Sequence, residues 1–293
     1  MKNILEIENL TKMYNKEAGI KNVNLSLREG EVIGIVGPSG SGKSTLIKSI
    51  LNYVNITDGK ITLFDTDLHK NYEEIMSIIG YVPDDFIDFP DTTSKDLLNY
   101  CAKFYNGNYE KDIDKLSIIF DLNLNKKIFE LSSGGKKKLN LIQAFFHNPK
   151  LLFLDEPTNF LDEFTINTLL NYLKRLKANY KSMLICSHEL SFLNAICDDI
   201  YLLTDHNLIK LDRSIFKSNY KKVILKTSVY YEYKTFMIKG VDKLDMQDDT
   251  VSFIYKGDIA YLLKYLSSLN ILDISILNPE ASEILGSLYY DNK

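Results

Sequence analysis

The sequence is poor in several residue types, and each scarcity excludes a class of protein. The 293 residues contain no tryptophan and only three cysteines, Cys101, Cys186 and Cys197, which stand apart without metal-ligand spacing. They predict free thiols in a reducing compartment rather than a zinc site or a disulfide framework. No apolar run approaches the roughly 18 residues of a membrane-spanning helix. Residues 1–6 also lack the apolar segment of a secretory signal.

The residues that are present indicate a folded globular protein. Hydrophobic residues make up 45% of the chain and charged residues 25%, which is enough apolar material for a buried core. The length suits one large domain or two ordinary domains. The net charge of −4 argues against a nucleic acid as the main partner.

A short apolar run, a glycine-rich loop and a helical pattern follow one another in residues 31–52. The loop, residues 37–44, matches G-x-x-x-x-G-K-[ST]. In this strand–loop–helix context the pattern predicts a phosphate site rather than an ordinary glycine turn. The glycines allow backbone N–H groups to surround a polyphosphate at the positive end of the following helix. We expect Lys43 to reach the β- and γ-phosphates and Ser44 to bind Mg²⁺.

Two carboxylates follow another apolar run, residues 151–154. Asp155, at the end of this predicted strand, is placed to hold Mg²⁺ through water. Glu156, one residue later, is placed to polarise the water that attacks a γ-phosphate. Buried carboxylates are costly unless a cation compensates them, which favours this interpretation over an acidic turn at the end of a strand.

Three further features each have two interpretations. His188 follows the apolar residues 183–186 and is either a hydrogen-bond donor to the γ-phosphate or a structural histidine. Residues 131–138 place serines, glycines and lysines before a predicted helix, which indicates an anion site or an ordinary helix cap with solvated lysines. Tyr14 is either a stacking platform for adenine or one exposed tyrosine among 19.

The apolar patterning predicts an α/β domain over residues 1–212 and a small α+β domain over residues 213–293. Within the first domain, residues 84–148 change to amphipathic helical patterns and predict a helical subdomain. Residues 10–15 are expected to form a turn between two strands. The elements expected in the second domain are strands at 223–225, 235–238 and 251–255 and helices at 258–269 and 279–290.

Taken in order, the motifs resemble those of the nucleotide-binding subunit of an ATP-binding cassette (ABC) transporter, over about residues 3–212. Residues 37–45 match the Walker A loop, residues 151–156 match Walker B, and residues 131–135 resemble the LSGGQ signature. Residues 159–162 resemble the D-loop. The resemblance implies a P-loop NTPase of the ABC ATPase type. Its parts are a mixed sheet core, an antiparallel β subdomain and a helical subdomain, here with a small C-terminal α+β appendage.

The resemblance also implies roles for individual residues. Glu156, His188 and Lys43 are expected to be catalytic, and Ser44, Asp155 and Asp84 are expected to bind the metal. The residues expected to bind the nucleotide are Tyr14, Gly37, Pro38, Ser39, Gly40, Ser41, Gly42, Lys43, Ser44, Thr45, Asp84, Ser132 and Gly134.

Two departures from the family pattern are visible. Asp84 stands where the family usually has glutamine, and an aspartate there is expected to act on the metal directly or through water. Ser133 and Gly135 replace the glycine and glutamine of the signature, whereas Ser132 and Gly134, the phosphate-facing pair, are retained. We therefore expect an ATPase of modest activity.

The resemblance implies a dimer of nucleotide-binding subunits, of one or two kinds, that closes around ATP and Mg²⁺. This dimer would power a separate transmembrane permease from the cytoplasmic face of the membrane. The acidic residue at 84, the loosened signature and the C-terminal tail resemble ABC-2-type exporters of antibiotics, bacteriocins and antimicrobial peptides. Two alternatives stay open: a soluble ABC ATPase without a transporter, and a weakly active regulatory cassette in a heteromeric pair.

Overall fold

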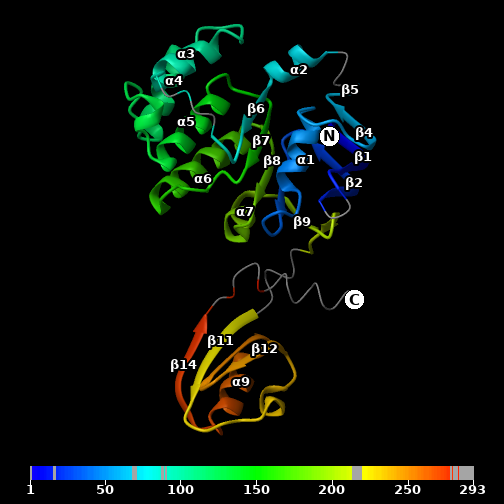
Figure 1. The fold of residues 1–293 in the computed structure, drawn as a ribbon, viewed down its shortest axis with the longest axis vertical. Coiled ribbons are helices and arrows are strands. Elements are labelled where there is room, and N and C mark those ends of the chain that lie inside the picture. Colours follow the sequence, from blue (N-terminus) through cyan, green and yellow to red (C-terminus); the bar gives the residue numbers. More distant parts are fainter. Residues whose placement is uncertain are drawn as a thin grey trace. The chain divides into compact units, whose positions relative to one another are not determined.

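The computed structural model describes residues 2–15, 18–67, 71–86, 89, 91–212, 220–277, 279 and 283. The chain divides into two compact units, residues 1–211 and residues 212–293 (Figure 1). None of the helices in the described residues has the length and apolar character of a bilayer-spanning segment.

A six-stranded sheet in the order β10-β9-β3-β8-β7-β6 forms the centre of the first unit. Five of its strands are parallel, and β10 runs antiparallel to β9. Every residue of β3, β7 and β8 is buried, as expected for parallel strands that are covered on both faces. The strands are β3 (Val32–Val36), β6 (Ile79–Val82), β7 (Leu151–Asp155), β8 (Ser182–Ser187), β9 (Asp199–Thr204) and β10 (Asn207–Lys210).

A second, antiparallel sheet has the order β2-β1-β4-β5, and helix α1 lies between the two sheets (Figure 1). Apolar side chains of α1 share one core with both sheets, Leu46 and Ile47 among them. The elements are β1 (Asn3–Met13), β2 (Gly19–Arg28), α1 (Lys43–Ile50), β4 (Asp58–Leu63) and β5 (Thr66–Asp67).

The expected turn at residues 10–15 is wrong for its first four residues, because β1 continues to Met13. Leu10 is fully buried and pairs with Val23 of β2. A register shift between Ile7 and Leu10, where Asn9 has a left-handed φ of 50°, lets the strand continue with Leu10 still facing the core.

The helical segment after β6 packs on the edge of the central sheet. Thr93 caps α3: its hydroxyl accepts a hydrogen bond from the Asp96 N–H (3.1 Å) and donates one to the Asp96 carboxylate (2.6 Å). Helix α5 contacts β6, and α7 contacts β3. The helices of the unit after α1 are α2 (Tyr72–Ser77), α3 (Ser94–Ala102), α4 (Glu110–Ile119), η1 (Ile128–Glu130), α5 (Ser133–Phe145), α6 (Glu163–Ala178) and α7 (Leu190–Ile196).

In its described residues, the second unit has a four-stranded antiparallel sheet in the order β12-β13-β11-β14 and the helix α9. Alternate residues of β11 and β13, such as Val223 and Phe253, form a core with Leu262 and Leu266 of α9. The elements are β11 (Tyr220–Thr227), η2 (Tyr233–Phe236), β12 (Val241–Gln247), β13 (Thr250–Lys256), α9 (Ile259–Leu266) and β14 (Ile271–Leu277).

Two expectations for this unit are corrected. The segment expected as a strand at residues 235–238 is not one: a 3₁₀ turn, η2, ends at Phe236, whose buried ring packs near those of Tyr231 and Phe253. One buried ring anchors this segment in the core, and such an anchor does not require the alternating apolar pattern of a strand. The helix expected at residues 279–290 lies outside the described residues, apart from Pro279 and Glu283.

Candidate functional site

The candidate site lies at the carboxyl-terminal edge of the central sheet. Strand β8 pairs in parallel with both β3 and β7, so the segments that follow these three strands emerge side by side. The glycine loop follows β3, Glu156 follows β7 and His188 follows β8. Ligands of open parallel sheets bind at this edge.

The glycine loop leads from β3 into α1. Gly42, the N-cap residue, has a left-handed φ of 105°, and no side chain caps the helix. A Cβ atom at Gly42 would lie 2.6 Å from the Ile20 side chain, and one at Gly37 would lie 2.5 Å from the Leu203 carbonyl oxygen. A Cβ at Gly40 would meet nothing within 4 Å. The loop is thus tightly packed at Gly37 and Gly42 and open at Gly40. The start of α1, which no side chain caps, suits an anion.

The other residues of the Walker A match lie in the loop or in the first turn of α1. Pro38 and Ser39 are exposed, and Ser41, Ser44 and Thr45 are half-buried. The Ser41 hydroxyl is buried without a hydrogen-bond partner, which leaves a polar group available inside the loop.

Lys43, the first residue of α1, has its ammonium group inside the site. Its side chain is 7% exposed, and Nζ donates hydrogen bonds to the carbonyl oxygens of Gly37 (2.8 Å) and Pro38 (3.1 Å). Nζ also lies 3.2 Å from Oε1 of Glu156. A buried ammonium among carbonyls and one carboxylate is a ready counter-charge for phosphate oxygens.

Glu156 lies between Lys43 and His188. Its backbone has a left-handed φ of 45°, and its N–H donates to the Cys186 carbonyl of β8 (2.8 Å). Oε2 accepts a hydrogen bond from the His188 N–H (3.1 Å) and lies 2.8 Å from the His188 imidazole Nδ1. The structure therefore brings the three expected catalytic residues together, with the carboxylate oriented by one cation and one imidazole.

Asp155 is buried, and burial raises its pKa to about 6, against a hydrogen bond with Ser44 that lowers it. Its Oδ1 has no hydrogen-bond partner. A buried carboxylate oxygen without a partner, beside a serine hydroxyl, has the chemistry of a Mg²⁺ site. The described residues contain no group of three acidic, histidine or cysteine ligands, so phosphate oxygens and water would supply the other ligands, as Mg²⁺ prefers.

Asp84, the third expected metal ligand, follows β6 and is held by two other residues. Its Oδ1 accepts a hydrogen bond from Nδ2 of Asn159 (2.8 Å) and lies 3.7 Å from Nζ of Lys137. Burial lowers the pKa of Lys137, and the negative charges of Asp84 and Asp155 oppose that shift. Lys137 was missed from the sequence because it stands in a run of three lysines. The charged residue at 84 was the available signal that a buried counter-charge is needed.

Ser132 and Gly134 open helix α5. Ser132 is exposed, and its hydroxyl caps the helix by accepting a hydrogen bond from the Gly135 N–H (3.1 Å). A Cβ at Gly134 would lie 2.7 Å from the carbonyl oxygen of Phe160, so the start of α5 packs against the loop after β7.

Tyr14 follows β1 and is 55% exposed. Its backbone N–H donates to the Ala18 carbonyl (2.9 Å), and the Lys12 ammonium lies 4.9 Å from its ring centroid. An exposed ring beside a cation suits stacking of a base that carries phosphates.

Comparison with known proteins identifies the fold. The "ABC transporter" family model matches residues 20–159. The chain is 32% identical over 213 residues to the bacitracin transport ATP-binding protein BcrA of Enterococcus faecalis, with 72% of the chain and 69% of the relative covered. The chain belongs to the ABC transporter family. It is an ATP-binding subunit of that family and an ABC-type ATP hydrolase.

Solved structures agree with this membership of the ABC transporter family. A structure described as the ATP-binding subunit of an ABC transporter is 26% identical with a TM-score of 0.67, over 73% of this chain and 92% of that one. A dimeric ATP-binding cassette in a post-hydrolysis state, bound to ADP and Pi, is 27% identical with a TM-score of 0.63, over 70% and 96%. These likenesses confirm the predicted fold class.

Proposed function

We propose that this subunit pairs with a second nucleotide-binding subunit around MgATP and powers the export of antimicrobial compounds through a separate permease. The observation that carries the proposal is the cluster of Lys43, Glu156 and His188 at the mouth of the glycine loop. One buried cation, one carboxylate and one imidazole meet where a terminal phosphate and its attacking water would lie.

Each residue of the cluster has a role in this proposal. When ATP enters, the Lys43 ammonium leaves the Glu156 carboxylate and binds the β- and γ-phosphates, because the phosphate oxygens carry more negative charge than one carboxylate. Glu156 then orients and deprotonates the attacking water, and His188 holds the carboxylate and donates to the γ-phosphate. Ser44 and Asp155 would hold Mg²⁺, with Asp84 acting through water. Bound Mg²⁺ would offset the charge of the phosphate oxygens.

The subunit is proposed to act as a head-to-tail dimer. Ser132 and Gly134 lie at an exposed helix start, which is available to a γ-phosphate bound by another copy. A cassette of the same fold has been solved as a dimer with ADP and Pi. ATP held between two subunits would join them, and hydrolysis would remove contacts that only the triphosphate makes. Tyr14 would stack on the adenine.

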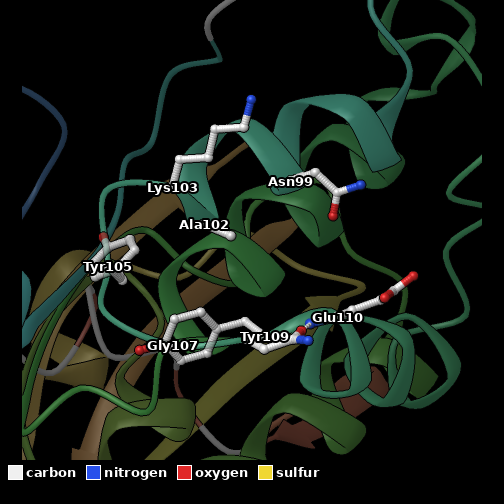
Figure 2. A pocket seen from close by; sticks show the side chains of 8 residues that line it. Asn99, Ala102, Lys103, Tyr105, Gly107, Tyr109 and Glu110 are labelled. Carbon is white, nitrogen blue, oxygen red and sulfur yellow. Dashed lines mark hydrogen bonds between the residues drawn. The ribbon is translucent and has the colours of Figure 1, made fainter.

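The helical segment offers a surface to the permease. Tyr100 and Phe104 of α3 are 58% and 70% exposed, with their ring centroids 5.4 Å apart. Other residues of α3 and of the chain that leads into α4 line a pocket of about 380 Å³ (Figure 2). Exposed aromatic side chains are typical of protein docking sites. The pocket is lined by Asn99, Ala102, Lys103, Tyr105, Gly107, Asn108, Tyr109 and Glu110.

The proposed cargo follows from the relatives. The Enterococcus faecalis relative is named for bacitracin transport, and antibiotic peptides are amphipathic compounds that partition into membranes. We place the subunit at the cytoplasmic face of the membrane, held there by its permease. Residues 1–212 would form the ATPase domain, with the helical subdomain at about 84–148, and residues 213–293 a separate α+β domain.

Reconstitution tests the proposal. The subunit would be placed in lipid nanodiscs with a candidate ABC-2-type permease, and phosphate release would be measured with and without bacitracin. We expect the permease to raise hydrolysis and the cargo to raise it further, with the Lys43→Ala variant inactive throughout. A rate of hydrolysis that is the same with and without the permease would favour a soluble ATPase. Hydrolysis that appears only with a second, different cassette would favour a regulatory subunit.

A further inference from the structure

Lys137 of helix α5 is charged and yet completely buried, and the proposed chemistry leaves it without a role. Its side chain is 0% exposed. Burying a lysine is costly unless hydrogen bonds and an anion compensate it. Nζ donates hydrogen bonds to the carbonyl oxygens of Pro83 (3.0 Å) and Asp84 (3.3 Å) and lies 3.7 Å from the Asp84 carboxylate. All of these partners belong to the segment that follows β6.

The same carboxylate is tied to a third segment. Asn159, in the loop after β7, donates a hydrogen bond to Oδ1 of Asp84 (2.8 Å). The ring centroid of Phe86 lies 5.7 Å from the Lys137 ammonium. It also lies 5.7 Å from the ring centroid of Phe160, which follows Asn159 in the loop after β7. The segments after β6 and β7 and the start of α5 thus meet around one ion pair, whose lysine is buried.

In the proposed site Asp84 acts on Mg²⁺ through water. The charge of its carboxylate can therefore favour or disturb the metal position between Ser44 and Asp155. Whichever cation neutralises Asp84 decides how much of its charge reaches that position.

We propose that Lys137 is a positioning residue for Asp84. It holds the Asp84 carboxylate on α5 and neutralises it, so that the charge at the metal position comes mainly from Asp155. The inference rests on the proposed MgATP site. It predicts that removing either partner changes the Mg²⁺ requirement in opposite directions. Without Lys137, the free carboxylate strengthens Mg²⁺ binding but misplaces the metal, and without Asp84, the unpaired cation weakens Mg²⁺ binding.

The experiment is a double-mutant cycle on the full chain with Lys137→Gln, Asp84→Asn and the two combined. ATP turnover would be titrated with Mg²⁺, and thermal unfolding would be measured without nucleotide or metal. We expect Lys137→Gln to lower kcat about tenfold while lowering the half-saturating Mg²⁺ concentration about threefold or more. Asp84→Asn should raise that concentration about threefold. The kcat loss of Lys137→Gln requires a free Asp84 carboxylate, so Lys137→Gln should leave kcat unchanged in the Asp84→Asn background.

Lys138→Gln, one residue along α5, is the matched control, since it removes an equal charge from a lysine whose ammonium donates a hydrogen bond to the Asp121 carbonyl oxygen (3.4 Å). It should leave the Mg²⁺ titration unchanged. If Lys137→Gln lowers kcat by the same factor in the wild type and in the Asp84→Asn background, the proposal is overturned. If Lys137→Gln does not fold, Asp84→Asn decides, because that side chain is 38% exposed and an unchanged Mg²⁺ requirement contradicts the proposal.

The experiment distinguishes a failure of the proposed function from a failure of the Lys137–Asp84 pairing. A wild-type chain that hydrolyses no ATP under any condition refutes the MgATP assignment. The unfolding cycle in the absence of ligand still measures the coupling between Lys137 and Asp84. Independent effects on the unfolding midpoint refute the pairing itself.

Discussion

Replacing Glu156 by glutamine removes one negative charge and almost no volume from the centre of the site. The side chain is 9% exposed, and it accepts a hydrogen bond from the His188 N–H that a glutamine oxygen can still accept. What is lost is the base that would take a proton from water. General bases contribute about 10²- to 10⁴-fold to a rate, so turnover should fall by that factor, or by about 3–5 kcal/mol in activation free energy.

The same substitution leaves Lys43 without its carboxylate. Lys43 keeps its hydrogen bonds to Gly37 and Pro38, so we expect a loss of about 1–3 kcal/mol in unfolding free energy without nucleotide. ATP should stabilise Glu156→Gln more than the wild type, because the phosphates no longer compete with a carboxylate for the ammonium.

Two assays check these magnitudes. Phosphate release at saturating ATP measures turnover, and thermal unfolding with and without ATP measures the stability terms. Glu163→Gln is the control, since that carboxylate is exposed in the first turn of α6 and its loss should alter neither quantity. Turnover of Glu156→Gln within threefold of the wild type would refute the assignment of the base.

Three further predictions concern single side chains. Lys43→Ala should weaken ATP binding roughly ten- to a hundredfold, measured with a fluorescent ATP analogue; unchanged affinity would contradict its role. Tyr14→Ala should weaken ATP binding about fivefold or more through lost stacking but leave tripolyphosphate binding unchanged, and equal losses for both ligands would argue against stacking. Burial lowers the pKa of His147 to about 4. The unfolded chain therefore takes up the proton first, and stability should fall by about 3 kcal/mol from pH 6.5 to pH 4. His147→Gln, measured by denaturant unfolding, should flatten that decline, and an undiminished slope would assign it to other groups.

The sequence predicted those parts of the fold that depend on local pattern. The buried runs of β3, β7 and β8 lie where expected, and the fold class is confirmed. The continuation of β1 through Leu10 was missed, because a bulge interrupts the alternation while the strand goes on. The 3₁₀ turn ending at Phe236 was missed because its core contacts come from residues distant in the chain.

The residues of the candidate site also fall into those that local sequence patterns predict and those that they do not. Lys43 with its loop and Glu156 were found because each motif is continuous in sequence, and their roles stay predictions. The salt bridge between Lys137 and Asp84 was missed, since 53 positions separate its partners and the charge at 84 does not say which lysine neutralises it. Long-range pairing of this kind is visible only in the structure.

The central claim is that ATP joins two subunits through Ser132, and a mass measurement tests it most directly. Light scattering would be recorded for Glu156→Gln with MgATP, with ADP, and with Ser132→Asp added. Aspartate keeps the helix cap but repels a γ-phosphate. We predict twice the 33.7 kDa chain mass with ATP alone, and the single-chain mass with ADP or after Ser132→Asp. A single-chain mass at saturating MgATP, or a dimer that Ser132→Asp leaves intact, would contradict the account.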